Sequence, residues 1–459
     1  MQEYFVELSK YFITLAIAFY ALESLLIFRL KQETQRSACY IRQICLLFLS
    51  QLLCFLTLYF RSKDREYLLF YMFIQVFMIA AVVLSPLIHE HINRGLLHNM
   101  CMLLGLGFVI LSRLSLHRAM RQFFIVVVVF IIGMILSMII AKLKFWYKLT
   151  WLYALLGISM LSTVLLLGNL TRGSKLSISL AGFTFQPSEV VKLIFILFLA
   201  AALYEDTSFK RIAVTAILAG MHVAVLAVSR DLGSALIFFV GFVFVVFVAS
   251  GSYLYLGLGI LGGCVSAVSA YYLFAHVRVR VLAWQDPFTY IDNQSYQITQ
   301  SFFAITNGSW FGTGLYRGRP EAIPYVDTDF VFSAVCEELG VISGICLLLI
   351  CLSCFVMMMR IGMESKDIFV RLAATGFGII YIFQVFLTIG GGIKFIPLTG
   401  VTLPLISYGG SSVMATLLMF SLVQGLCIKE GEERNVYGRN TKKKRSQQDN
   451  VQKRTGKKS

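Results

Sequence analysis

Charged residues are scarce in this chain, at 14% of 459 residues, whereas a soluble domain of ordinary composition carries about a quarter. Hydrophobic residues make up 58% of the chain, and many of them stand in long apolar runs. The core of a soluble protein does not need several apolar runs of the length that crosses a membrane. The composition therefore excludes a soluble globular protein.

The chain also lacks the patterns of metal-binding and disulfide-linked proteins. Its six His show no metal-ligand spacing, and its ten Cys are scattered, mostly within the apolar runs. We expect these Cys to fill space between helices. No cleavage site follows the first ten residues, which contain two Glu, so we expect the first apolar run to remain in the protein as a span.

Thirteen apolar runs have about the length of a membrane-spanning helix. Their length and near-continuous apolarity predict helices rather than the strands of a barrel. We therefore expect an all-α, polytopic membrane helix bundle. Its predicted spans are residues 7–30, 40–60, 67–87, 97–114, 121–142, 149–170, 187–204, 209–229, 232–250, 253–276, 330–359, 368–391 and 403–427.

The net charge of +16 is concentrated at the C-terminus, where residues 439–459 hold nine Lys or Arg and one Asp. Such a run cannot pack, so residues 429–459 are predicted to be a disordered tail. A basic tail could bind nucleic acid, but directly after a span it is more typical of the cytoplasmic side and of contact with anionic membrane lipids. We expect no nucleic-acid partner and a cytoplasmic C-terminus.

Polar content divides the rest of the chain into two parts. Residues 1–94 hold three ordinary apolar spans, in which Glu23 is the exception; we expect it to pair with a neighbouring Arg rather than to act in function. Residues 95–428 carry polar, Gly and Pro features. The stretch 277–329 is too long for a connecting loop, so we predict an extracytoplasmic functional loop. Residues 388–412 are irregular, which at membrane depth requires burial or a wet cavity.

Two groups of charged residues are candidates for chemistry. Glu189 and Lys192 are three residues apart, so they share a helix face and form either a structural ion pair or the charged wall of a substrate cavity. Asp327 and Asp329 close the long loop at the membrane boundary, where a carboxylate can act as a base or hold a divalent cation. Helix capping by one of these two aspartates is the interpretation that the pattern alone favours.

Cationic residues form a further candidate site, since they could meet around an anionic ligand such as a diphosphate. Scattered surface positions are the alternative. The residues are Arg278, Arg280, Arg317, Arg319 and Lys394.

Five motifs in order resemble the SEDS family, the shape, elongation, division and sporulation proteins of the RodA, FtsW and SpoVE type. The resemblance covers about residues 95–428. The motifs are Phe185-Gln-Pro-Ser-Glu-Val-Val-Lys192, Asp231-Leu-Gly-Ser-Ala, Gln297-Ile-Thr-Gln-Ser301, Thr328-Asp-Phe-Val-Phe332 with Glu337-Glu-Leu-Gly340, and Pro397-Leu-Thr-Gly400 followed by Leu403-Pro404 and Ser407-Tyr-Gly-Gly-Ser-Ser412.

The resemblance implies a ten-helix core, here with about three extra N-terminal helices, in the bacterial cytoplasmic membrane. It implies a peptidoglycan glycosyltransferase that polymerises lipid II, with Asp329 as base or metal ligand, and a class B penicillin-binding protein as partner. We expect a divalent cation, Mg²⁺ or Mn²⁺, at Asp329. The residues expected to bind substrate are Glu189, Lys192, Arg280, Gln297, Lys394 and Ser407.

The chain departs from the family pattern before Gln186, where the family has Gly-Ala-x-Arg-Trp-Ile and this chain has Leu176 and Ser177 in place of Arg and Trp. We expect Trp284 or Trp310 to supply the lost aromatic contact. A silent scaffold for a penicillin-binding protein and a lipid II transporter are the alternative functions. The retained site residues favour the polymerase over the scaffold, and the lack of an internal repeat disfavours a transporter.

Overall fold

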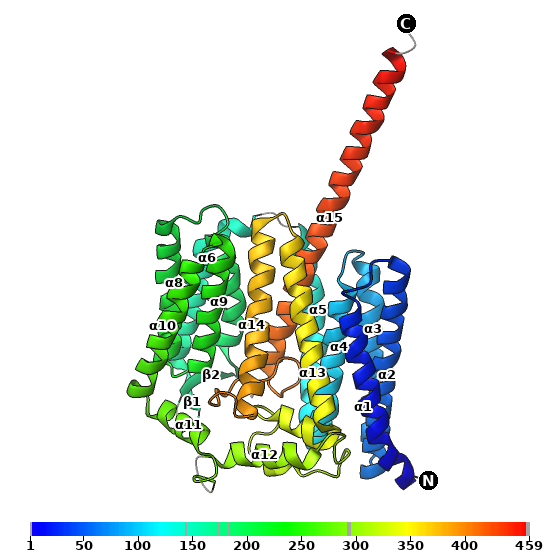
Figure 1. The fold of residues 1–459 in the computed structure, drawn as a ribbon, viewed down its shortest axis with the longest axis vertical. Helices are drawn as coiled ribbons and strands as arrows, with labels where there is room; N and C mark the ends of the chain where they lie inside the picture. The colour runs from blue at the N-terminus through cyan, green and yellow to red at the C-terminus, as the bar shows by residue number, and fades with distance from the viewer. Residues whose placement is uncertain (1, 143–144, 172–173, 181–182, 292–294, 456–459) are drawn as a thin grey trace.

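The computed structural model describes residues 2–455 apart from 143–144, 172–173, 181–182 and 292–294. The described chain is a bundle of roughly parallel helices (Figure 1). Twelve of the described helices are long and apolar enough to cross a membrane. The predicted all-α polytopic bundle is therefore confirmed.

Three N-terminal helices lie together on one side of the bundle: α1 (Gln2–Leu26), α2 (Glu33–Ser62) and α3 (Glu66–Ile88) (Figure 1). α1 packs on α13, whereas α2 and α3 pack on α4. Within this group Arg42 holds Glu23 in a bidentate ion pair, with Nε–Oε1 at 2.7 Å and Nη2–Oε2 at 2.9 Å. The predicted pairing of Glu23 with a neighbouring Arg is confirmed.

The next helices form the first part of the core. α4 is buried along its length, because α2, α3, α5 and α13 all pack on it. α7 is buried nearly as completely, and α6, α9 and α14 surround it. The elements are α4 (Arg94–Leu114), α5 (Leu116–Lys142), the 3₁₀ helix η1 (Trp146–Leu149), α6 (Thr150–Leu167), α7 (Pro187–Ala202), α8 (Phe209–Val228), α9 (Leu232–Ser250) and α10 (Tyr253–Leu273).

The predicted number of thirteen spans exceeds the twelve helices of spanning length in the described chain. The difference is the predicted span 187–204, which forms α7 with only 16 residues. At 1.5 Å per residue such a helix is about 24 Å long, shorter than the roughly 30 Å of a hydrocarbon core. α7 is therefore an enclosed core helix rather than a full lipid-facing span.

A small antiparallel sheet follows α6 and was not predicted. Its strands are β1 (Asn169–Thr171), β2 (Ser174–Leu180) and β3 (Phe183–Phe185), in the order β1-β2-β3. The pattern of β2 contains the signal, because Leu176, Ile178 and Leu180 alternate with serines at the period of a strand. Leu176 and Ser177, which replace the family's Arg and Trp, thus lie on β2.

Residues 277–329 are not the loop without regular structure that the sequence predicted. Two helices, α11 (Ala275–Gln285) and α12 (Tyr296–Gly308), and the 3₁₀ helix η2 (Pro320–Ala322) lie in this part of the chain. Figure 1 shows α11 and α12 at one end of the bundle, with α12 running across it. The stretch is a helical cover over that end of the bundle.

The last three helices are α13 (Val331–Glu364), α14 (Ile368–Gly392) and α15 (Gly410–Thr455). The predicted irregular region 388–412 is irregular from residue 393 to 409, which connects α14 to α15. Its residues make hydrogen bonds with several helices. These bonds satisfy polar backbone groups of the irregular segment inside the bundle.

α13 is broken at Gly340, which has φ +88°. The chain around residue 310 fills the break: Thr313 and Gly314 N–H donate to the carbonyls of Glu337 and Glu338, at 2.9 and 3.0 Å. A Cβ on Gly340 would lie 2.3 Å from the Trp310 carbonyl oxygen. The break therefore requires glycine both for its backbone conformation and for the close approach of the second chain segment.

The tail differs from the prediction of disorder from residue 429. α15 continues to Thr455 and projects from the bundle at the end opposite to α11 and α12 (Figure 1). The part of α15 within the bundle supplies the nucleus that an isolated helix would have to form. The Lys, Arg and Gln residues that follow have good helix propensity.

Candidate active site

The loop of residues 393–409 forms the centre of the polar site. Arg280 of α11 reaches this loop and donates from Nη1 to the Thr399 carbonyl at 3.0 Å. Asp329 approaches the same place from the segment before α13. A Cβ built on Gly400, which has φ +76°, would lie 3.6 Å from Arg280 Nη2 and 3.9 Å from Asp329 Oδ2. The guanidinium and the carboxylate therefore meet beside Gly400.

Arg280 and Asp329 line a cavity of about 210 Å³. Gln297 of α12 also lines it, so three of the predicted site residues share one cavity. The wall is otherwise largely apolar. The remaining lining residues are Val279, Ala283, Ile298, Tyr325, Leu398 and Gly400.

The electrostatics of the cavity depend on a half-buried guanidinium. Burial lowers the pKa of Arg280, and the carboxylates of Asp329 and Asp231 act in the opposite direction. Arg280 is thus flanked by two acids and keeps its charge, because the ordinary pKa of arginine is far above neutral. The cavity can present a positive charge to an anionic ligand next to the Asp329 carboxylate.

Backbone contacts hold Asp329 in place from both sides. The N–H of Asp329 donates to the Tyr325 carbonyl at 3.0 Å. Ser407 Oγ, which is buried, donates to the Thr328 carbonyl at 2.5 Å. Tyr408 N–H donates to the Asp327 carbonyl at 2.7 Å. The predicted site residue Ser407 therefore positions the segment of Asp329, and its hydroxyl is occupied by that contact.

The two aspartates do not take the N-cap position of α13 that the pattern favoured. The N-cap residue is Phe330, and its side chain makes no capping bond. Asp327 instead forms an ion pair with Arg118 at the start of α5. An ion pair with a guanidinium binds a carboxylate more strongly than hydrogen bonds from the exposed N–H groups of a helix end.

Glu189 and Lys192 form a buried ion pair at 2.5 Å. Lys192 Nζ also donates to Gln384 Oε1 at 2.7 Å, and Gln384 Nε2 donates to the Thr402 carbonyl at 3.0 Å. The pair is therefore connected to the 393–409 loop but does not line the Asp329 cavity. The structure thus shows the ion pair and places it outside the cavity of Asp329.

Asp231 is a half-buried acid that the sequence analysis quoted in a motif without assigning it to the site. It caps α9 by accepting from Ser234 N–H at 3.1 Å, and it accepts from Ser188 Oγ at 3.0 Å. Burial raises the pKa of Asp231; the hydrogen bonds from Ser234 and Ser188 oppose this rise, and Glu189 adds to it. An acid at the start of a span was the signal that could have identified it.

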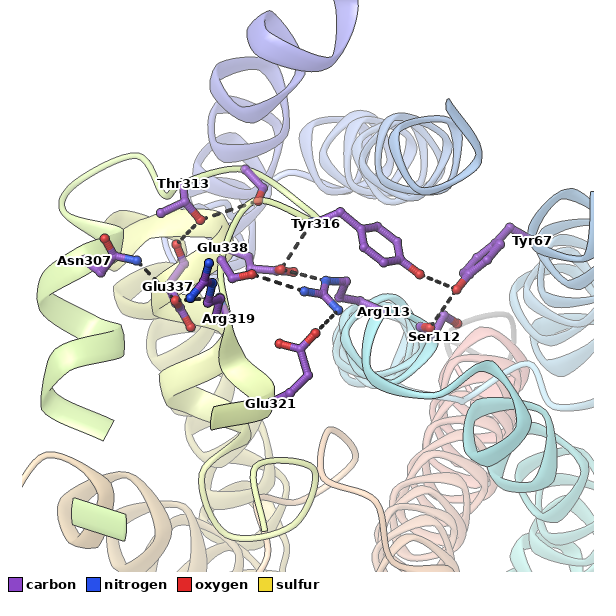
Figure 2. Close-up of polar contacts among 12 residues, drawn as sticks. Tyr67, Ser112, Arg113, Asn307, Thr313, Tyr316, Arg319, Glu321, Glu337 and Glu338 are labelled. Atoms are coloured by element: carbon purple, nitrogen blue, oxygen red, sulfur yellow. Dashed lines mark hydrogen bonds and ion pairs between the residues drawn. The ribbon is translucent and has the colours of Figure 1, made fainter. Parts of the chain in front are cut away.

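The remaining predicted cations do not gather around one ligand. Lys394 lies at the start of the loop, next to the C-terminal end of α11. Its carbonyl accepts from Trp284 Nε1 at 3.0 Å, and its Nζ lies 3.4 Å from the Gln285 carbonyl. Arg317 pairs with Glu7, and Arg319 N–H donates to Glu337 in a separate cluster (Figure 2). Only Arg280 of the five predicted cations lines the described cavity.

A metal ion fits this cavity only in combination with a ligand. Among the described residues no group of three His, Cys, Asp or Glu is arranged to hold an ion. Asp329 is the one carboxylate among the cavity residues. Mg²⁺ is commonly held by one or two carboxylates together with substrate phosphates. The donor set thus fits a cation that arrives with a phosphorylated substrate.

Residues 94–430 match the family model of the FtsW, RodA and SpoVE proteins, which is described as "Cell cycle protein". The chain belongs to this SEDS family. The match begins at α4, so α1, α2 and α3 are additional to the family region.

Several curated SEDS proteins are similar to the chain. It is 33% identical to "Peptidoglycan glycosyltransferase RodA" of Mycobacterium tuberculosis over 267 residues. The aligned region covers 55% of this chain and 57% of that protein. The chain thus spans a little over half the length of these RodA relatives. It is 32% identical to "Probable peptidoglycan glycosyltransferase FtsW" of Aliivibrio salmonicida, over 74% of this chain and 87% of that protein. It is 33% identical to "Stage V sporulation protein E" of Bacillus subtilis, over 62% of this chain and 81% of that protein.

Two solved SEDS structures share the fold. A chain from the structure titled "Structural coordination of polymerization and crosslinking by a peptidoglycan synthase complex" aligns with a TM-score of 0.63 and 28% identity, over 73% of this chain and 97% of that chain. Thermus thermophilus RodA aligns with a TM-score of 0.56 and 26% identity, over 74% of this chain and 97% of that chain.

Proposed function

We propose that this chain is a peptidoglycan glycosyltransferase that polymerises lipid II into glycan strands. The observation that carries the proposal is the shared cavity of Asp329, Arg280 and Gln297 in a member of the SEDS family. The names of the RodA and FtsW relatives support the same activity.

In this proposal the 4-hydroxyl of the acceptor GlcNAc attacks C1 of the donor MurNAc, and undecaprenyl diphosphate leaves. Asp329 accepts the proton of the attacking hydroxyl as general base. Arg280 lies beside the leaving diphosphate and stabilises its developing negative charge. Gln297 lines the same cavity and orients the saccharide by hydrogen bonds.

A divalent cation, Mg²⁺ or Mn²⁺, is part of the proposal, with Asp329 as its protein ligand. Such an ion neutralises charge on the diphosphate when it is bound. The single carboxylate at the cavity supports a cation that enters with the substrate rather than one held permanently.

We also propose a class B penicillin-binding protein as partner, the cytoplasmic side for the C-terminus and the outer side for residues 277–329. The resemblance to a chain of a peptidoglycan synthase complex supports the partner. The position of α11 and α12 at the end of the bundle opposite to the projecting part of α15 supports the orientation (Figure 1).

The test is polymer formation by the purified protein, alone and with its cognate penicillin-binding protein, from labelled lipid II. We expect long glycan strands from the wild type. If no polymer forms with the partner present, the polymerase proposal is wrong and the scaffold function takes its place. The absence of Arg and Trp at Leu176 and Ser177 is the observation that favours this second candidate.

A further inference from the structure

The three-helix extension of α1, α2 and α3 lies outside the family region but contacts the part of the chain that leads to Asp329. Its partners are residues 312–317, between α12 and η2, and the break at Gly340 in α13. These contacts are hydrogen bonds and an ion pair made by named side chains. Helices that only packed against the core would not need such polar contacts.

Tyr67 in the first turn of α3 makes the central contact. Its hydroxyl oxygen lies 2.5 Å from the hydroxyl oxygen of Tyr316 and 3.3 Å from the Ser112 carbonyl, to which it donates (Figure 2). The two hydroxyls and the Ser112 carbonyl form a polar chain from residue 316 through the extension to α4.

Tyr316 is held in a backbone conformation that needs such support. Its φ is +63°, in the left-handed region that non-glycine residues rarely adopt. Its N–H donates to Glu338 Oε1 at 3.2 Å, and the Arg113 guanidinium lies 4.3 Å from its ring centre. A residue persists in this region only where its surroundings fix it. The Tyr67 hydroxyl is one of the three contacts that do so.

Arg113 connects Tyr316 to the start of α13. Its Nε donates to Glu338 Oε1 at 2.7 Å, and its Nη1 donates to Glu321 Oε1 at 2.8 Å (Figure 2). The Arg113 and Glu338 side chains are 6% and 1% exposed. Glu338 Oε1 accepts from both Arg113 Nε and Tyr316 N–H, so the Tyr316 contacts help to determine the placement of Glu338, two turns beyond Asp329.

α1 adds a second set of contacts to the same region. Lys10 Nζ lies 3.4 Å from the Gly312 carbonyl oxygen, and Glu7 pairs with Arg317 at 3.5 Å. Thr14 Oγ1 lies 3.2 Å from the Leu339 carbonyl oxygen, at the break of α13. The same carbonyl accepts from Ser343 Oγ of α13 at 2.7 Å, so Thr14 lies beside a carbonyl that α13 itself already satisfies. The extension thus touches the break through polar groups of α1.

We propose that the N-terminal extension is a positioning element for the Asp329 site, in which the Tyr67 hydroxyl fixes Tyr316 and, through Arg113 and Glu338, the first turns of α13. This inference rests on the proposed polymerase function only for its activity readout. Tyr67 is a positioning residue, because it lies outside the cavity and acts through other residues.

The test compares Tyr67→Phe, Tyr316→Phe and the double variant in the full-length protein. Each change removes one hydroxyl and keeps the ring. Tyr71→Phe is the matched control, since Tyr71 lies on the same helix and the structure records a ring contact with Phe55 for it. One readout is lipid II polymerisation, separated into kcat and KM; the other is amide hydrogen exchange of residues 312–321, which needs no activity.

We expect Tyr67→Phe to lower kcat about 2- to 10-fold, the effect of losing one buried hydrogen bond, with KM and membrane yield unchanged. Exchange of residues 312–321 should become faster. The double variant should be no worse than Tyr67→Phe alone, because Tyr67→Phe already removes the contact between the two hydroxyls. Tyr71→Phe should match the wild type in both readouts.

Three outcomes would overturn the inference. Tyr67→Phe could behave like Tyr71→Phe in both readouts, Tyr316→Phe could add a further loss on top of Tyr67→Phe, or kcat could fall without a change in exchange at residues 312–321. If the wild type makes no polymer, the proposed function fails, and the exchange of residues 312–321 alone decides the positioning role.

Discussion

Asp329 and Arg280 converge on the backbone of Gly400, although they belong to different segments of the chain. A glycine at this point leaves no side chain between the carboxylate and the guanidinium. An acid–base group and a positive charge therefore share one cavity wall, which is the arrangement that glycosyl transfer from a diphosphate donor needs.

Asp329→Asn should abolish polymerisation without loss of folding or membrane insertion. The amide keeps the size and shape of the side chain but cannot accept a proton as a base. Polymer length and yield from labelled lipid II measure the effect, and Asp286→Asn is the control, because Asp286 is an exposed acid that bonds its neighbour Thr289. Wild-type polymerisation by the Asp329 variant would remove this residue from the mechanism.

Arg280→Lys should lower kcat/KM for lipid II about 10-fold or more, since hydrogen bonds to charged groups are among the stronger ones. Lysine keeps the charge but lacks the planar donor fork that reaches both the Thr399 carbonyl and an anionic ligand. Arg278→Lys is the matched control on the exposed side of α11. Equal activity of the two variants would contradict a role for Arg280 at the diphosphate.

Excess chelator should stop polymer formation, and Mg²⁺ or Mn²⁺ should restore it. The reason is the charge of the leaving diphosphate, which one guanidinium neutralises only in part. Turnover is measured against free cation concentration. Full turnover in chelator would show that Arg280 is sufficient and that the expected divalent cation is wrong.

A cysteine at Asn307 should be labelled by a membrane-impermeant reagent added from outside, whereas one at Ser446 should be protected. Asn307 is exposed at the end of α12, and residue 446 belongs to the projecting part of α15 at the other end of the bundle. The exposed native Cys45 and Cys264 are first replaced by Ser. The opposite labelling pattern would reverse the proposed orientation.

Trp310→Ala should raise the KM for lipid II several-fold with a smaller effect on kcat, because an aromatic ring buries the apolar face of a sugar with few frozen torsions. Trp310 is 63% exposed and available for such a contact. Trp284→Ala should also weaken substrate use, but its indole N–H donates to Lys394, so kcat should fall as well.

Ser177→Trp restores the family residue on β2, and we expect activity equal to or above the wild type. The three variants are compared in the same lipid II titration. If both truncations leave KM unchanged in an active polymerase, the long segment does not compensate for the missing Trp, and that prediction is wrong.

Local sequence patterns predicted those parts of the molecule that depend on near neighbours. The apolar runs predicted the helices, and the three-residue spacing of Glu189 and Lys192 predicted their pairing, because residues at this spacing share a helix face. The Glu23 pair was predicted from the cost of a lone carboxylate in a span.

Contacts between distant segments could not be read in the same way. Arg113 and Glu338 are 225 positions apart, and nothing in either neighbourhood identifies the other as its partner. For the same reason the sequence left open whether the five cations meet or lie scattered: Arg317 and Arg319 have acidic partners at another place in the bundle. The cavity itself depends on how α11, α12 and the 393–409 loop pack, which their own patterns do not specify.

The close approach of two backbone segments at the break of α13 limits what can be learned from large sets of variants. At Gly340 a Cβ would meet the Trp310 carbonyl oxygen at 2.3 Å, and at Gly312, with φ +80°, it would meet the Glu338 carbonyl oxygen at 2.3 Å. Every other amino acid carries that carbon. In a mutational scan both positions should be intolerant throughout, and their intolerance would report on main-chain geometry and not on chemistry at the cavity.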